Sequence, residues 1–272
     1  MGATASRQLV IENLAFRPPH PSYDHSHPNL HILTTPRRNI AIMRFLLDSH
    51  NQNNGKDMDT RRVILYAHGN ACDIGQCAFL LNELSQTLKT DIVAIDYPGY
   101  GLSRTLPEKQ KPSARECSDS LYAVFEWLRR EGYATQNIFL YGVSIGTGPR
   151  TRLAAHLGNI GVPLGGVLLQ SPFTSIVGVG SHAAATTMHM CSDAFVSPDI
   201  FQSINYIGYV DAPLVIVHGD HDTLIPIDHA SQLALANSHA RLVVVKGAGH
   251  NNIESEQYMP ILLSAWDLLL TK

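Results

Sequence analysis

From Val63 onward, short apolar runs alternate with longer segments of helical periodicity. The runs are rich in Val, Ile and Leu and each ends in polar or Gly-rich sequence; they are Val63–Ala67, Ile92–Asp96, Ile138–Tyr141, Gly166–Ser171, Leu214–His218 and Arg241–Val245. Apolar runs of this length between helices are typical of buried parallel strands. The pattern therefore predicts an α/β fold with a mostly parallel central sheet and helices on both faces.

Two of the helices are clearly marked. Ser113, with Glu116 three residues later, has the spacing of a capping box, and Gly132 supplies a stop. The apolar face of this helix holds Cys117, Leu121, Val124 and Leu128. The last helix has an apolar stripe of Leu262, Leu263, Trp266, Leu269 and Leu270. Each stripe predicts a helix that packs one face on the sheet.

The pattern changes before Val63. Leu9–Phe16 and Ile40–Leu46 are predicted to be edge strands, and the Pro- and His-rich stretch Pro18–Pro28 lies between them. We expect them to form an antiparallel edge beside the parallel sheet. The polar segment Asn51–Thr60 is predicted to be a mobile loop.

Composition narrows the class of protein. The chain has 272 residues, a formal charge of −3, 44% hydrophobic and 16% charged residues. This composition predicts a sizeable core, and it lacks the basic excess of a nucleic-acid-binding protein. No apolar run approaches the about 18 residues of a membrane span, and Met1–Phe16 lacks the pattern of a secretory signal. We expect a cytoplasmic protein with no nucleic-acid partner.

The cysteines and clustered histidines give weak signals for a metal site. In a chain without an export signal, we expect Cys72, Cys77, Cys117 and Cys191 to be buried thiols rather than disulfides. Cys72 and Cys77 lack the second pair of a typical zinc site. His20, His25, His27 and His31 lie in or just after a Pro-interrupted stretch, which favours a solvated loop. The sequence therefore predicts neither a metal nor a cofactor.

The strongest chemical motif is Gly142-Val143-Ser144-Ile145-Gly146, which follows the strand Ile138–Tyr141 and precedes the helical stretch Thr147–Leu157. A strand, a sharp Gly-flanked turn and a helix in this order form a nucleophile elbow, which lifts the serine hydroxyl off the sheet. The motif predicts that Ser144 is a catalytic nucleophile.

A serine nucleophile needs a base, and the base needs an orienting acid. Asp222 follows the strand Leu214–His218, and His250 follows the strand Arg241–Val245 on a Gly-rich turn. All three residues are therefore expected at the carboxyl edge of one sheet. Asp222 is predicted to be the acid, because Asp228 is expected in the first turn of a helix and Asp220 is expected to fix the loop. His68, His218, His221 and His229 also lie near strand ends, where structural roles are expected.

The tetrahedral intermediate of such a reaction needs two backbone donors. The N–H of Ile145, directly after the nucleophile, is one candidate. The turn His68-Gly69-Asn70-Ala71 after the first parallel strand offers the N–H of Asn70 as the second. Asn70 and Ile145 are therefore predicted to form the oxyanion hole.

Read together, these residues resemble the α/β-hydrolase superfamily over nearly the whole chain. Five segments also resemble the subgroup called α/β-hydrolase domain-containing protein 17: Ala15–Pro19, His68–Ala71, Asp96–Gly101, Tyr141–Thr147 and Gly247–Asn251. That subgroup removes palmitoyl groups from cysteines of membrane-attached proteins. The resemblance implies a thioesterase in which Ser144, Asp222 and His250 form the catalytic triad.

One departure from the subgroup concerns membrane attachment. Its members carry an acylated N-terminal cysteine cluster, and this sequence has none. The chain instead begins Met1-Gly2-Ala3-Thr4-Ala5-Ser6, which fits the pattern for N-myristoylation of Gly2. A single myristoyl chain gives only weak, reversible binding. We expect a distribution between the cytoplasm and the cytoplasmic face of membranes.

These observations predict a single α/β-hydrolase domain over residues 1–272, with a small cap in 172–204. The apolar residues of that segment either line an acyl-chain groove or pack on the sheet as an ordinary helix. The predicted activity is hydrolysis of acyl thioesters, with an acylated protein or a lipid ester as partner. Two alternatives stay open: a lipase or carboxylesterase acting on small lipid esters, and a non-catalytic binding protein that retains the fold.

Overall fold

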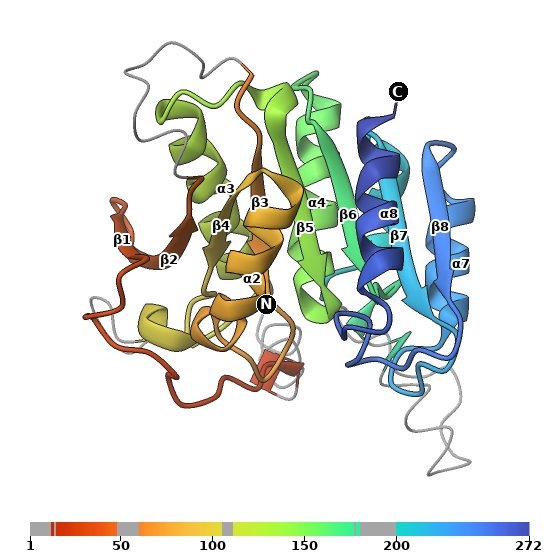
Figure 1. Cartoon of the computed structure of the whole chain (residues 1–272), viewed down its shortest axis with the longest axis horizontal. Coiled ribbons are helices and arrows are strands. Elements are labelled where there is room, and N and C mark those ends of the chain that lie inside the picture. The colour runs from red at the N-terminus through yellow and green to blue at the C-terminus, as the bar shows by residue number, and fades with distance from the viewer. Residues whose placement is uncertain are drawn as a thin grey trace, which may run out of the picture.

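The computed structural model describes residues 12, 13, 15–47, 60–104, 111–176, 178, 179 and 200–271. Within these ranges, eight strands form one sheet in the order β1-β2-β4-β3-β5-β6-β7-β8 (Figure 1). The strands are β1 Leu30–Thr34, β2 Asn39–Phe45, β3 Val63–Ala67, β4 Asp91–Ile95, β5 Ile138–Val143, β6 Gly166–Gln170, β7 Leu214–Gly219 and β8 Ala240–Val245. The helices are α2 Ile74–Leu88, α3 Ala114–Arg130, α4 Thr147–Asn159, α6 Ser203–Tyr206, α7 Ile227–Leu235 and α8 Met259–Leu270.

The six strands predicted from apolar runs are confirmed as β3 to β8. They pair in parallel throughout, and their ends differ from the predicted ends by no more than two residues. The carboxyl ends of all six strands therefore lie along one edge of the sheet. β5 extends through Val143, so the strand ends directly at the predicted nucleophile.

Helices cover both faces of the sheet (Figure 1). α2 and α8 pack on one face, and α3, α4 and α7 pack on the other. In β3, Leu65 belongs to the second of these layers, while Ile64 and Tyr66 belong to the first. Because both faces are covered, every residue of β3 is buried. This explains why these strands appear in the sequence as continuous apolar runs rather than alternating ones.

The antiparallel edge is present, but one of its strands was predicted wrongly. β2 pairs antiparallel with β4, and its other neighbour is β1, Leu30–Thr34, rather than Leu9–Phe16. The hairpin turn between β1 and β2 is closed by Thr35 N–H, which donates to Arg38 O at 2.9 Å. β1 contains no fully buried residue, so it lacks the apolar run that marks the inner strands.

In the segment predicted as the first edge strand, Glu12, Asn13 and Ala15 are helical. The Glu12 carboxylate accepts the N–H of Ala114 at 3.0 Å, at the beginning of α3. A negative charge at a helix N-terminus is favourable, because the free N–H groups there carry partial positive charge. Phe16 is buried and packs edge-on against Tyr100 and Phe201. Long-range contacts of this kind decide the conformation of the segment, and local periodicity does not reveal them.

The two marked helices are confirmed. Ser113 caps α3, since its Oγ accepts the N–H of Glu116 at 3.1 Å, and Gly132 follows with a φ of 96°. In α8, Leu262, Trp266 and Leu269 are buried as predicted. Leu270 was placed on the buried stripe wrongly, because it is 39% exposed at the end of the helix.

Several sequence predictions concern residues outside the described ranges. They are Gly2 with its myristoylation pattern, the loop residues 51–59, Cys191 and residues 177 and 180–199 of the predicted cap. Among the helices that the structure describes, none is long and apolar enough to cross a membrane.

The cap of α3 gives a stability prediction. Ser113→Ala removes the acceptor for the Glu116 N–H, so the free energy of unfolding should fall by about 1 kcal/mol. Ser118→Ala is the matched control in the same helix, because its hydroxyl donates only to the carbonyl of Ala114 one turn earlier. It should change stability by less than about 0.5 kcal/mol. Chemical denaturation measures both variants, and equal losses would contradict the capping role.

Candidate active site

The predicted nucleophile occupies a tight turn at the carboxyl end of β5. Ser144 has a φ of 52°, a left-handed backbone conformation that residues other than glycine rarely adopt. A Cβ added at Gly142 would lie 2.6 Å from Gly146 O, and one at Gly146 would lie 2.5 Å from Ala67 O. The turn therefore requires glycine on both sides of the serine. α4 begins directly after this turn, at Thr147.

The structure brings the three predicted catalytic side chains into one hydrogen-bonded chain. Ser144 Oγ lies 3.0 Å from His250 Nε2, and His250 Nδ1 lies 2.7 Å from Asp222 Oδ2. The geometry fits a tautomer in which Nδ1–H donates to the carboxylate and Nε2 accepts from the serine hydroxyl. The His250 side chain is 10% exposed and that of Asp222 is fully buried. Within this hydrogen-bonded series, Ser144 and His250 thus lie nearer the protein surface, and the Asp222 carboxylate lies beneath them.

Backbone and side-chain donors fix the Asp222 carboxylate. Its Oδ1 accepts the N–H groups of Leu224 at 2.9 Å and Ile225 at 2.8 Å. The buried His218 lies close to the other oxygen, with its Nε2 3.4 Å from Oδ2. Burial opposes ionisation, but hydrogen bonds from His218, His250 and Ile225 hold the pKa of Asp222 well below its usual range. The carboxylate is therefore charged at neutral pH and faces His250.

The two competing carboxylates lie elsewhere. Asp220 Oδ1 accepts the N–H of Gly247 at 2.7 Å, and Oδ2 pairs with Lys246 at 3.2 Å. This contact ties the loop after β7 to the loop after β8, as the sequence suggested. Asp228 lies in the first turn of α7. In the structure Asp222 is the carboxylate in contact with His250.

The other histidines near strand ends have structural partners or lie at the surface. His68 is buried, and its Nε2 lies 3.2 Å from Asp96 Oδ1. His229 Nδ1 lies 2.8 Å from the Thr174 hydroxyl. His221 is exposed. Of the histidines near strand ends that the structure describes, His250 is therefore the one that contacts Ser144.

The turn after β3 lies beside the nucleophile. A Cβ added at Gly69 would lie 3.8 Å from Ser144 Cβ, so this turn and the serine are immediate neighbours. Asn70 is the next residue, and Ile145 directly follows Ser144 in the turn Ser144–Gly146 that leads into α4. Of the two predicted oxyanion-hole residues, Ile145 therefore lies in the same turn as Ser144, and Asn70 lies in the turn beside it.

The Asn70 side chain anchors this turn to the N-terminal segment. Its Nδ2 donates to Ala15 O at 2.6 Å, and its Oδ1 accepts from the Tyr100 hydroxyl at 2.7 Å and from Arg17 N–H at 2.9 Å. The side chain is thus fully engaged in holding the turn, and the backbone N–H is the group that the site would use. The motif predicted the turn, but no sequence signal indicated this anchor.

A polar cluster beneath the site was also missed. The Tyr141 hydroxyl donates to Gln170 Oε1 at 2.6 Å and lies 3.3 Å from Glu254 Oε1. Burial raises the pKa of Glu254 despite the opposing effect of these neighbours. On α4, which packs on the other face of the sheet, Arg150 is fully buried with its Nε 3.3 Å from the backbone O of Tyr141, and burial lowers its pKa to about 9. Glu254 follows His250 by four residues, so the cluster supports the loop that carries the histidine.

Two further features bear on ligands. Among the described residues, no group of three or more His, Cys, Asp or Glu side chains is placed to hold a metal ion.

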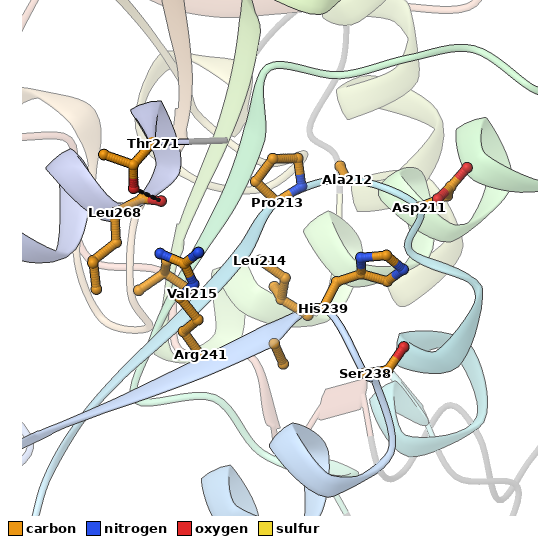
Figure 2. A pocket seen from close by; sticks show the side chains of 11 residues that line it. Asp211, Ala212, Pro213, Leu214, Val215, Ser238, His239, Arg241, Leu268 and Thr271 are labelled. Atoms are coloured by element: carbon orange, nitrogen blue, oxygen red, sulfur yellow. Dashed lines mark hydrogen bonds between the residues drawn. The ribbon is translucent and has the colours of Figure 1, made fainter.

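A groove of about 420 Å³ lies at the amino ends of β7 and β8, lined in part by Asp211, His239 and Arg241 (Figure 2). Because Ser144, Asp222 and His250 follow strand ends, this groove lies at the opposite edge of the sheet and is no part of the site.

Comparisons with known proteins show the family to which the chain belongs. The family model for the alpha/beta hydrolase fold matches residues 62–197. The chain is 31% identical to human alpha/beta hydrolase domain-containing protein 17B, over 90% of this chain and 86% of that protein. It is 36% identical to the 17C protein of Mus musculus over 72% of this chain, and spans only 56% of that relative's length.

Solved structures share the fold. Est1E from Butyrivibrio proteoclasticus, with ferulic acid bound, has a TM-score of 0.65 at 14% identity. The match covers 88% of this chain and 98% of that one. At this identity the likeness concerns the fold alone.

Glu254 gives a prediction for stability against pH. In the native protein, the Glu254 carboxyl keeps its proton at pH values above its ordinary pKa of 4.5. As pH rises, the carboxyl therefore ionises in the unfolded state before it ionises in the native state. The wild type should therefore lose stability between pH 4.5 and the raised native pKa, whereas Glu254→Gln should lack this loss. Urea denaturation across that window measures it, with the exposed Glu256→Gln as control. A constant difference between the wild type and Glu254→Gln would contradict the raised pKa.

Proposed function

Because the chain belongs to the α/β-hydrolase fold family, we propose that it is a serine hydrolase that cleaves acyl thioesters, with S-palmitoyl groups on proteins as the substrate. The observation that carries the proposal is the hydrogen-bonded chain from Ser144 through His250 to the buried Asp222. A non-catalytic protein with this fold would have no need for a serine held at positive φ against an imidazole.

In the proposed mechanism, Ser144 Oγ attacks the acyl carbonyl carbon while His250 Nε2 takes its proton. Asp222 keeps the imidazole in the required tautomer and stabilises the imidazolium that forms. The N–H groups of Asn70 and Ile145 bind the developing oxyanion. Collapse expels the thiol and leaves an acyl-serine, and His250 then activates the water that hydrolyses it.

Two considerations favour thioesters. A thiol with a pKa of about 8.5 leaves with little help from a general acid, whereas an alkoxide needs its proton more. The resemblance to the subgroup α/β-hydrolase domain-containing protein 17 also favours a thioester substrate. The sequence identity to its members 17B and 17C supports that resemblance. A carboxylesterase shares every catalytic residue, so substrate kinetics separate the two activities.

The described ends of the 172–204 segment pack on the body of the protein. Phe173 and Phe201 are buried. The Phe201 ring packs edge-on against the Phe16 ring, with the two ring centroids 6.1 Å apart. A Cβ at Gly148, in the first turn of α4, would lie 2.5 Å from Phe201 Cγ. Phe201 therefore closes the core beside α4. We propose that the wall for the acyl chain includes part of the segment 172–204, of which residues 177 and 180–199 lie outside the described residues.

Myristoylation of Gly2 and reversible attachment to the cytoplasmic face of membranes remain proposals drawn from the sequence. They would bring the site to acylated proteins at the membrane surface.

The triad is tested by substitution. Ser144→Ala and His250→Ala should each lower kcat by about 10⁴–10⁶, and Asp222→Asn somewhat less, because the members act as a unit. A fluorophosphonate probe should label the wild type on Ser144 and should not label Ser144→Ala.

The control is Asp220→Asn, two residues away, which removes a loop contact and leaves the triad intact. It should lower kcat far less than Asp222→Asn. Equal labelling of Ser144→Ala, or the reverse ranking of the two aspartates, would contradict the assignment.

The substrate class is tested with a series of acyl thioesters and matched oxygen esters. Each buried CH₂ contributes about 0.8 kcal/mol, so kcat/KM should rise with chain length and should be higher for thioesters. Met188→Asp and Phe195→Asp should flatten the profile. The matched control is Phe79→Asp, at an 80% exposed position on α2, which should leave it unchanged. A flat or falling wild-type profile would exclude the long-chain substrate and leave the triad unaffected.

A further inference from the structure

Two thiols meet at the beginning of α2, directly after the candidate oxyanion turn. Cys72 Sγ lies 3.3 Å from Cys77 Sγ, and both are free thiols. Asp73 caps α2, so Cys72 precedes the cap and Cys77 is the fourth residue of the helix. Side chains at these two positions commonly touch across the first turn of a helix. The local geometry of the cap therefore holds the two sulfur atoms in contact.

The two sulfur atoms have different surroundings. Cys72 is half-buried and Cys77 is buried. The hydrogen bond from Cys77 lowers the pKa of Cys72, with a further contribution from His68. The hydrogen bond with Cys72, together with burial, raises the pKa of Cys77. Cys72 is therefore the more accessible and the more readily ionised member of the pair, as an attacking thiolate must be.

The buried His68 acts electrostatically on Cys72. Burial disfavours its protonated form, but Asp96, 3.2 Å away, outweighs this effect and raises the pKa of His68. The imidazole, held by the Asp96 carboxylate, thereby favours the thiolate form of Cys72.

We propose that Cys72 and Cys77 form a redox-active dithiol that closes to a disulfide when a peroxide oxidises it, and that this closure lowers the activity of the adjoining site. The disulfide itself does not depend on the proposed function. Its effect on hydrolysis rests on that function.

The chemistry balances with hydrogen peroxide as the oxidant. The Cys72 thiolate attacks one peroxide oxygen, the O–O bond breaks, and Cys72 becomes a sulfenic acid as hydroxide leaves and takes a proton to form water. The Cys77 sulfur then attacks Cys72 Sγ, the S–O bond breaks, and the oxygen leaves as a second water with the Cys77 proton. Two thiols lose two electrons and two protons, and one peroxide is reduced to two waters.

Closure must shorten the sulfur separation from 3.3 Å to about 2.05 Å. The beginning of α2 resists movement, because Asp73 accepts the N–H groups of Gln76 at 3.0 Å and Ser22 at 2.7 Å. Ile74 N–H is also held by Asp96, at 3.0 Å. The displacement therefore falls on Cys72 and the residues before it.

Those residues carry the candidate oxyanion donor. Only Ala71, at a φ of 53°, separates Cys72 from Asn70. A shift of Cys72 toward α2 would pull the Asn70 N–H away from the position it needs beside Ser144. Loss of one oxyanion donor lowers kcat by about 10²–10³, so a displaced donor should lower it by about tenfold or more.

The experiment uses the full chain, reduced and then treated with hydrogen peroxide, with remaining thiols blocked by iodoacetamide. Intact mass should show the loss of two hydrogen atoms, and peptide mapping should identify a Cys72–Cys77 link that dithiothreitol reverses. The hydrolysis rate should fall by about tenfold and recover on reduction.

Cys72→Ser and Cys77→Ala should each abolish both the link and the peroxide response, while each retains the rate of the reduced wild type. Cys117→Ser is the matched control, because Cys117 is buried in the layer of α3, away from the pair. It should keep both the link and the response.

The outcomes separate the two proposals. Two alkylated cysteines at positions 72 and 77 after peroxide treatment would show that the thiols serve only as packing at the helix start, and would overturn the dithiol. A link with no change in rate, or a rate loss that persists in Cys72→Ser, would overturn the switch. If the reduced protein neither hydrolyses esters nor reacts with a fluorophosphonate, the proposed function fails, yet the mass measurement still tests the disulfide.

Discussion

The site depends on one strained residue. Ser144 is held at positive φ at the end of β5, which for a residue other than glycine costs about 1–3 kcal/mol. The neighbouring packing holds it there: Gly146 fits against the backbone of Ala67, and the Thr147 hydroxyl donates to Ser144 O at 2.7 Å. Because Ala67 ends β3, the turn that carries Ser144 and the turn after β3 are fixed against each other. The strain places the serine hydroxyl above the sheet edge.

The parallel order of the strands supplies the rest of the constellation. β5, β7 and β8 end at the same edge, so the loops after them bring together Ser144, Asp222 and His250, although these residues are far apart in sequence. Short contacts between loops, such as that of Asp220 with Gly247, hold the last two loops in register. The arrangement of these three side chains therefore comes from rigid strand ends joined by a few polar contacts.

The sequence predicted the parts of this structure that depend on local pattern. Six buried strands, the capped helix α3 and the order of Ser144, Asp222 and His250 all follow from runs, spacings and motifs. It failed for β1, whose partly exposed residues form no apolar run, and for the helical turn around Glu12, which caps a helix 102 residues away. The Asn70 anchor and the Glu254 cluster were missed for the same reason. Their partners lie in distant segments, and no periodicity encodes such contacts.

Two buried carboxylates organise the segments on the two sides of Ser144 in the same way. Asp222 accepts the backbone N–H groups of Leu224 and Ile225 and faces His250. On the other side, Asp96 accepts the N–H of Ile74, bonds the Tyr23 hydroxyl and faces His68. A carboxylate with backbone donors is stable in the interior because its charge is hydrogen-bonded. Asp222 orients His250, and Asp96 holds His68 in the turn after β3 together with the start of α2. The two sides of the candidate site are therefore anchored separately, and a change at the Asp96 side can alter the turn after β3 while Ser144, His250 and Asp222 stay in contact.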